Sequence, residues 1–188
     1  MTALSFSERL AAVREQLSRR NVDGLVVLRG DEFLGEYVAP YAERLAWLTG
    51  FTGSAGMALV LPDRAAVFSD GRYTVQLDEQ VDGALWERLH ITQIPPQQWL
   101  THHAQGLRIG YDPRLISEAG LTALEGRGFE FVALENNPLD AAWPDQPARP
   151  RTPVIFQSPD LSGETSDSKR ARLATELRAN GENAALVT

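Results

Sequence analysis

The sequence predicts an α/β domain built on a mixed β-sheet with flanking helices. Short apolar runs of strand length alternate along the chain with segments that have helical periodicity. Two of these runs are separated only by the turn-forming residues 62–64, which indicates an antiparallel hairpin in a sheet that also has parallel pairs. The run at residues 24–28 is continuously apolar, as is typical of a strand buried on both faces.

The first half of the chain opens with a helix. Ser5 and Glu8 fit a capping box, in which the two side chains satisfy free backbone N–H groups at a helix start. Gly50 stands where a glycine commonly ends a helix. In order, we expect a helix that begins after Ser5 and fades at residues 19–21, a strand at 24–28, a loop at 29–40, a helix at 42–48, and hairpin strands at 57–61 and 65–68.

Helices and strands continue to alternate in the second half. Pro95 and Pro96 suit the first turn of a helix, where a missing N–H costs little, and Ser117 suits a helix N-cap. In order, we expect a helix at 73–81, a strand at 86–94, a helix from 95–96, a strand at 108–111, a helix from 117 that ends at Gly126 or Gly128, and a strand at 129–134.

The character of the chain changes after residue 135. Six prolines fall within residues 136–159, and because proline fixes φ and removes a donor, we expect an extended connector there. The pattern of the opening helix and strand recurs at residues 169–188, which suggests a second, related domain. We therefore expect an N-terminal α/β domain at 1–135, a Pro-rich connector at 136–159, and the first helix and strand of a truncated second domain at 160–188. A lone strand lacks sheet partners, so the chain is expected to be a piece of a longer protein.

Composition excludes several classes of function. The net charge of -7 and the pI near 5.0 disfavour nucleic-acid binding, which needs a basic face. The chain has no cysteine, which excludes disulfides, thiolate metal ligands and a Cys nucleophile. No apolar stretch approaches the ~20 residues of a membrane span, and the start lacks the apolar run of a signal peptide. We expect a cytoplasmic protein that binds neither nucleic acid nor membranes.

Histidines and a small-residue turn are weak site candidates. His102 and His103 are adjacent, so on a helix their rings point about 100° apart and share a metal poorly, and His90 is the remaining histidine. Residues 53–56, Gly-Ser-Ala-Gly, match neither a phosphate loop nor a nucleophile elbow and suit a tight turn. A structural role is the better interpretation of both features.

A cluster of carboxylates precedes Pro40. Asp31, Glu32 and Glu36 could perform acid–base work or hold a cation. In an acidic protein, however, such a loop is more often solvated surface, and this is the interpretation that we favour.

Arg72, in the motif at residues 70–73, is the strongest candidate site residue. It stands at a predicted helix start, where the macrodipole favours anions, so it requires some other partner. That partner is either a carboxylate of the chain, from Asp70, Asp78 or Glu43, or a carboxylate or peptide carbonyl of a ligand. The pattern alone leaves both interpretations open.

Five motifs occur in order along the chain. They are Glu36-Tyr-Val-Ala-Pro40, Arg44 with Trp47, Gly50-Phe-Thr-Gly-Ser-Ala-Gly56, Asp70-Gly-Arg-Tyr73 with Gln76, and Leu139-Asp140-Ala-Ala-Trp143-Pro-Asp145-Gln-Pro147. Together they resemble the corresponding stretches of the three-domain Xaa-Pro aminopeptidases, the aminopeptidase P family. The resemblance spans essentially the whole chain and implies the fold of the creatinase-like N-terminal domain.

The resemblance also implies a function for the parent protein. Such enzymes remove the N-terminal residue from peptides with proline in second position. Their catalytic domain carries two divalent metals, usually manganese, and this chain is expected to lack both that domain and the metal ligands. The expected partners are therefore peptide substrates, the missing middle and catalytic domains and a second copy in a homodimer. Arg72 matches the family's substrate-contacting arginine, and the resemblance places no catalytic residue in this chain.

Two departures and two alternatives accompany the resemblance. Gln146 stands where the family has an arginine, which puts a salt bridge at the connector in doubt, and residues 33–35 stand where relatives often carry His-Gln. One alternative is a free-standing binding or dimerisation module without peptidase activity. The other is a relative with creatinase-like C–N hydrolysis. The motifs at residues 50–56 and 70–73 favour the aminopeptidase.

Overall fold

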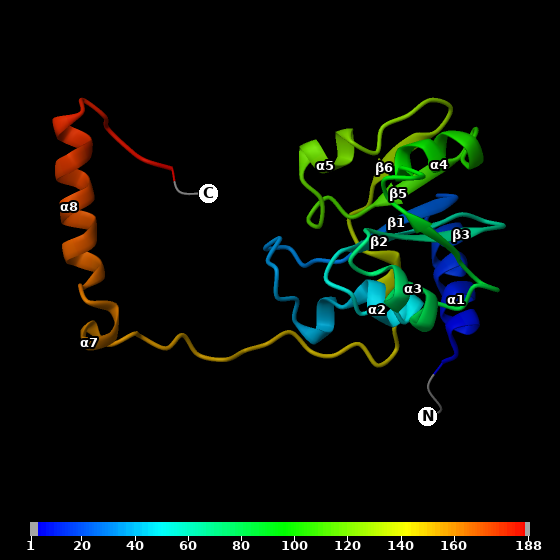
Figure 1. Ribbon diagram of the computed structural model, residues 1–188, viewed down its shortest axis with the longest axis horizontal. Coiled ribbons are helices and arrows are strands. Elements are labelled where there is room, and N and C mark those ends of the chain that lie inside the picture. The colour runs from blue at the N-terminus through cyan, green and yellow to red at the C-terminus, as the bar shows by residue number, and fades with distance from the viewer. Residues whose placement is uncertain (1–3, 187–188) are drawn as a thin grey trace. The chain divides into compact units, whose positions relative to one another are not determined.

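The structure, a computed structural model, describes residues 4–186 and consists of two compact units. The first unit extends to Pro150 and contains a β-sheet with helices on both faces (Figure 1). The second unit begins at Arg151. Within residues 4–186, no helix combines the length and the apolar character that crossing a membrane requires.

A mixed sheet forms the centre of the first unit and confirms the predicted fold class. Within the described residues its strands are β1 (Gly24–Leu28), β2 (Gly56–Val60), β3 (Ala65–Ser69), β4 (Glu87–His90), β5 (Arg108–Tyr111) and β6 (Glu130–Ala133). They lie in the order β4-β3-β2-β1-β5-β6. β2 is antiparallel to both neighbours, whereas β1, β5 and β6 are parallel to one another and β3 is parallel to β4. All of these strands except β2 therefore point the same way, and their carboxyl ends lie along one edge of the sheet.

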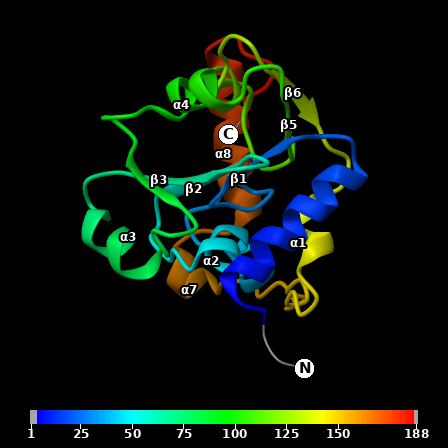
Figure 2. The same ribbon diagram turned by 90° about the vertical axis from the view of Figure 1, so that its right-hand side faces the viewer.

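Helices cover both faces of this sheet (Figures 1 and 2). On one face lie α1 (Phe6–Arg19), α2 (Arg44–Thr49), α3 (Thr74–Gln80) and α6 (Pro138–Ala142), and on the other lie α4 (Pro96–His103) and α5 (Glu118–Thr122). The core is divided in the same way. Val27 packs in the cluster under α1, whereas its neighbour Val26 packs in the cluster under α4, because successive strand residues point to opposite faces.

The helix ends follow the predicted capping signals. Ser5 accepts from the backbone of Glu8 while the Glu8 carboxylate accepts from the backbone of Ser5, so the capping box is complete. Gly50 ends α2 with φ +83°, and a Cβ at this position would lie 2.9 Å from the carbonyl oxygen of Gln80. Both the conformation and the close approach therefore require glycine.

Two elements, β4 and α5, end several residues before their predicted ends. β4 ends at His90, whereas a strand at 86–94 was expected, because residues 91–94 fold into a turn in which the Ile94 N–H donates to the His90 carbonyl. α5 ends at Thr122 and does not reach Gly126, because the Leu124 N–H bonds to the carbonyl three residues before it, as in a tightened last turn.

The expected extended connector at residues 136–159 is wrong in its first part. Pro138 occupies the first turn of α6, and Leu139 is fully buried against α1. Trp143 stacks on Trp47 with ring centroids 5.2 Å apart. Apolar side chains at helical spacing thus outweigh the breaking tendency of proline, which a helix tolerates at its start. Residues 147–158 are exposed and lack regular structure, as predicted for the connector.

The second unit contains α7 (Pro159–Ser162) and α8 (Ser166–Ala179), neither of which has a buried residue. The strand predicted at the end of 160–188, where residues 184–188 repeat the pattern of 24–28, is not formed at residues 184–186, and positions 187 and 188 lie outside the described residues. A strand without a neighbour has no ladder to join, which explains its absence at 184–186. That this segment begins a second, related domain stays a prediction.

Limited proteolysis should cut within residues 147–158 before it cuts the first unit. These residues are exposed and free of helix and strand, so a protease can bind them without unfolding a packed core. Mass spectrometry of the earliest fragments would locate the cuts. Early cleavage inside residues 40–60, where α2 and β2 are buried, would contradict this expectation.

Candidate functional site

Loops from distant parts of the sequence meet where the carboxyl ends of β1, β3 and β4 lie beside the amino end of β2. Gly56 pairs with Ser69, and Ser69 pairs with His90, so the segments flanking these residues are neighbours. The loop after β1 starts here too, since the Arg29 N–H donates to the Gly56 carbonyl at 3.3 Å. We refer to this region as the carboxyl edge. In open α/β sheets, ligands bind outside the carboxyl ends of strands, which makes the carboxyl edge the candidate site.

Arg72 lies at the carboxyl edge, in the turn between β3 and α3. Its Nε and Nη2 donate to the two carboxylate oxygens of Asp70 at 3.0 and 2.8 Å, and its backbone N–H donates to Asp70 Oδ1 at 3.0 Å. The guanidinium carbon lies 5.3 Å from the ring centroid of Tyr73. The Arg72 side chain nevertheless stays 68% exposed. The intrachain partner is thus Asp70, and the pair leaves the guanidinium accessible to a ligand.

The small-residue turn at 53–56 packs against this motif. The hydroxyl oxygens of Ser54 and Tyr73 are 2.5 Å apart. A Cβ at Gly53 would lie 2.3 Å from Phe51 Cζ and 2.8 Å from Tyr73 Cδ1. The interpretation as a turn that requires small residues is therefore confirmed, and the turn fixes the aromatic ring beside Arg72.

Two acidic groups at the carboxyl edge titrate at lower pH than usual. Hydrogen bonds from the side chain and backbone of Arg72 lower the pKa of Asp70 to about 2. The hydrogen bond with Ser54 lowers the pKa of the Tyr73 phenol. Asp70 is therefore a carboxylate throughout the neutral and mildly acidic range, and its ion pair with Arg72 persists there.

The acidic loop before Pro40 is held by its own contacts. Asp31 is buried and accepts hydrogen bonds from two backbone N–H groups of the same loop at 3.0 and 3.4 Å. Glu32 accepts from the Tyr41 hydroxyl at 2.7 Å and pairs with Arg149. Glu36 is exposed. The interpretation as solvated surface is therefore wrong for Asp31, which is buried, and for Glu32, which is mostly buried and paired, and it holds for Glu36.

The histidines also have structural neighbours. His103 Nδ1 lies 2.9 Å from a guanidinium nitrogen of Arg64, and its ring lies beside Trp99. The ring of His102 lies 6.3 Å from that of His103, while His90 closes β4 at the carboxyl edge. Among residues 4–186, no three His, Cys, Asp or Glu side chains are grouped as a metal site requires.

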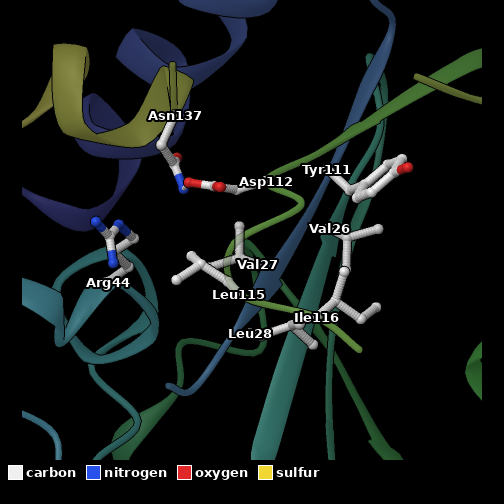
Figure 3. Close-up of a pocket in the computed structure, with 9 residues that line it drawn as sticks. All are labelled: Val26, Val27, Leu28, Arg44, Tyr111, Asp112, Leu115, Ile116 and Asn137. Carbon is white, nitrogen blue, oxygen red and sulfur yellow. Dashed lines mark hydrogen bonds between the residues drawn. The ribbon is translucent and has the colours of Figure 1, made fainter. Parts of the chain in front are cut away.

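A small cavity lies at the ends of β1 and β5 (Figure 3). Its volume of about 10 Å³ has room for about one water molecule, far too little for a peptide. In its wall the Asn137 amide donates to Asp112 at 3.3 Å, and Arg114 pairs with Asp112 at 2.8 Å. Burial opposes ionisation of Asp112, but the hydrogen bonds from Arg114 outweigh it and lower the pKa of this carboxyl. The full lining is Val26, Val27, Leu28, Arg44, Tyr111, Asp112, Leu115, Ile116 and Asn137.

The ion pair that anchors α6 was not predicted from the sequence. Arg44, whose side chain is 4% exposed, donates to Asp140 through Nε at 2.7 Å and Nη2 at 2.9 Å. Gln146 donates to Asp140 Oδ1 and to the Tyr41 carbonyl, both at 2.9 Å. Gln146, which replaces the family's arginine, thus supports the salt bridge between Arg44 and Asp140. The sequence signal that could have indicated this ion pair is that Arg44, Asp140 and Gln146 all lie within the five motifs.

Comparisons with known proteins bear on the whole chain. A family model described as the creatinase/prolidase N-terminal domain matches residues 9–139. A probable Xaa-Pro aminopeptidase P of Aspergillus fumigatus is 36% identical over 94% of this chain and 28% of its own length. Human Xaa-Pro aminopeptidase 2 is 33% identical over 95% of this chain and 27% of its own length.

A solved structure of a similar protein has the same fold as this chain. It is an X-prolyl aminopeptidase from Caenorhabditis elegans, described as a cytosolic enzyme with a di-nuclear active site. It superposes with a TM-score of 0.82 at 27% identity and covers 95% of this chain and 32% of that one. The chain therefore spans about a third or less of the length of these relatives.

Proposed function

The chain belongs to the creatinase/prolidase N-terminal domain family, and from this premise we propose that it is the non-catalytic N-terminal domain of a Xaa-Pro aminopeptidase. The observation that carries the proposal is the agreement over nearly the whole chain with proteins of that activity. The fold matches the Caenorhabditis elegans enzyme over 95% of the chain, and relatives named Xaa-Pro aminopeptidase match a similar share. The parent protein would remove the N-terminal residue from peptides with proline in second position, in the cytoplasm.

Within that enzyme the domain would contribute to substrate binding through Arg72. The side chain is held by Asp70 and exposed at the carboxyl edge, where it can donate to a peptide. Its contribution would be to position the peptide beyond the scissile bond, since no proton transfer requires it. A further contribution would be assembly with the middle and catalytic domains and with a second subunit.

The metals belong to another domain in this proposal. The donor sets on residues 4–186 do not fit a di-metal site, because no three potential ligands are grouped. We place two divalent metals, expected to be manganese, in the catalytic domain of the parent, where they would supply the chemistry of hydrolysis. Every residue described here then serves binding or structure.

The chain alone should therefore neither bind manganese tightly nor cleave a Xaa-Pro peptide, while the full-length parent should do both. The expected result in titration calorimetry is no stoichiometric heat from Mn²⁺ with the 188-residue chain. A tight 1:1 or 2:1 site in this chain would contradict the placement of the metals. A full-length parent that leaves Xaa-Pro peptides intact in the presence of Mn²⁺ would contradict the proposed activity.

A binding or dimerisation role is the second candidate, and one observation favours it. The loop after β1 exposes Phe33, Leu34 and Tyr37 by 79%, 58% and 91%, and Leu34 has a φ of +52°, which is uncommon for a bulky residue. Analytical ultracentrifugation of the parent enzyme carrying both Phe33→Ser and Tyr37→Ser would test this role by measuring the oligomeric state. A loss of dimer with unchanged peptidase activity would favour the assembly role of this loop.

A further inference from the structure

Asp70 occupies one edge of the Arg72 guanidinium and leaves the other edge to solvent. The carboxylate takes the Nε and Nη2 donors, and it also fixes the backbone through the Arg72 N–H. Within residues 4–186, Nη1 donates to no protein acceptor. A guanidinium can bind a second acceptor through its Nη1–Nη2 edge while the first edge is occupied. The side chain is thus already oriented for one further acceptor.

The electrostatics of this arrangement are as informative as its geometry. Asp70 and Arg72 together carry no net charge. Of the other groups near Asp70, Arg88 is paired with Asp78, with Nε 3.4 Å from Oδ1, and the titratable side chains of His90 and Tyr73 also face Asp70. A ligand that approaches the free edge of Arg72 therefore meets oriented N–H donors but little net positive charge. Such a site favours a neutral carbonyl over an anion, because only the anion gains strongly from an unpaired cation.

We propose that Asp70 is a positioning and specificity-determining residue, which holds Arg72 so that its free edge binds a backbone carbonyl of the peptide and cancels the charge that would otherwise select a free C-terminal carboxylate. This inference rests on the proposed function of Arg72. It specifies which ligand group Arg72 takes: the peptide bond of a substrate that continues beyond the site, not the terminus of a short one.

The test uses the full-length parent enzyme and two substrates that differ in one group. They are the same Xaa-Pro-Xaa tripeptide with a C-terminal carboxylate and with a C-terminal amide. The measured quantity is the ratio of kcat/KM for the acid to kcat/KM for the amide. The ratio of each variant is divided by that of the wild type, so that preferences of the catalytic domain cancel.

Asp70→Asn keeps the shape of the side chain and removes its charge. The expected result is a rise in the acid-to-amide ratio of roughly five- to tenfold, mostly through a lower KM for the acid. At about 1 M salt, where the Debye length falls to about 3 Å, most of that rise should disappear. Asp70→Glu keeps the charge but not the geometry, so kcat/KM should fall for both substrates while their ratio stays near that of the wild type.

Asp63→Asn is the matched control, since it removes the charge of another aspartate paired with a nearby arginine. Asp63 lies in the β2–β3 turn, at the opposite edge of the sheet, and contacts Arg64. It should leave the ratio unchanged. An unchanged ratio in Asp70→Asn, with Arg72→Ala still impairing cleavage, would overturn the inference about Asp70 and leave the role of Arg72 intact. Wild-type kinetics in Arg72→Ala for both substrates would instead overturn the proposed role of Arg72 itself.

Discussion

Replacing Asp140 with alanine should lower the free energy of unfolding of the first unit by about 3–5 kcal/mol. The carboxylate accepts both Nε and Nη2 of Arg44, whose side chain is 4% exposed. Without it, a buried guanidinium loses its counter-charge. Within the described residues Arg44 Nη1 already lacks a hydrogen-bond partner. Water entering the neighbouring cavity would hold the loss towards the lower end of this range.

Chemical denaturation followed by tryptophan fluorescence would measure the effect, because Trp47 and Trp143 stack beside the ion pair. Gln146→Ala is the graded control. It removes two hydrogen bonds around Asp140 but no charge, and it should cost about 1–2 kcal/mol. Replacing Arg44 with methionine together with Asp140→Ala should recover much of the loss, since no unpaired charge then remains buried. A loss below about 1 kcal/mol for Asp140→Ala would show that Arg44 finds another partner.

Local signals predicted most of the fold. Ser5 and Glu8 predict the start of α1, because a capping box depends on two residues only three positions apart. Gly50 predicts the end of α2, because the residue after the helix adopts a left-handed backbone conformation. The run at 24–28 matches its strand because a continuous apolar segment has few alternatives to a buried sheet. These features are determined within a few residues of where they appear.

The parts that could not be predicted depend on contacts between distant residues. Arg44 and Asp140 are 96 positions apart, and neither composition nor periodicity indicates that they pair. The prolines around α6 predict a connector, whereas the burial of Leu139 and Trp143 stabilises a helix there. The carboxyl edge depends on the strand order, in which β2 lies between β1 and β3. A single sequence does not specify this order.

The candidate site shows the same division. Arg72 stood out in the sequence because a cation at a helix start needs a partner that the helix does not supply. The sequence offers Asp70, Asp78 and Glu43 as partners of Arg72, and only the structure distinguishes Asp70 from the other two. The contact between Ser54 and Tyr73 joins two motifs that were recognised separately. Sequence reasoning thus found the members of the site but not the contacts that organise them.

Replacing Arg72 with alanine in the full-length parent should lower kcat/KM for a Xaa-Pro peptide roughly ten- to a hundredfold, the usual effect of losing a charge-assisted hydrogen bond to substrate. Arg72→Lys should restore part of the activity, because an ammonium supplies charge but cannot donate through two edges at once. Stability should change little, since the side chain is 68% exposed and its partner Asp70 is also solvated after the replacement. Steady-state kinetics of the parent and thermal unfolding of the 188-residue chain would be measured side by side. Intact kinetics with a clearly lower melting temperature would identify Arg72 as a structural residue, because an arginine that serves the ligand is needed in turnover and not in folding.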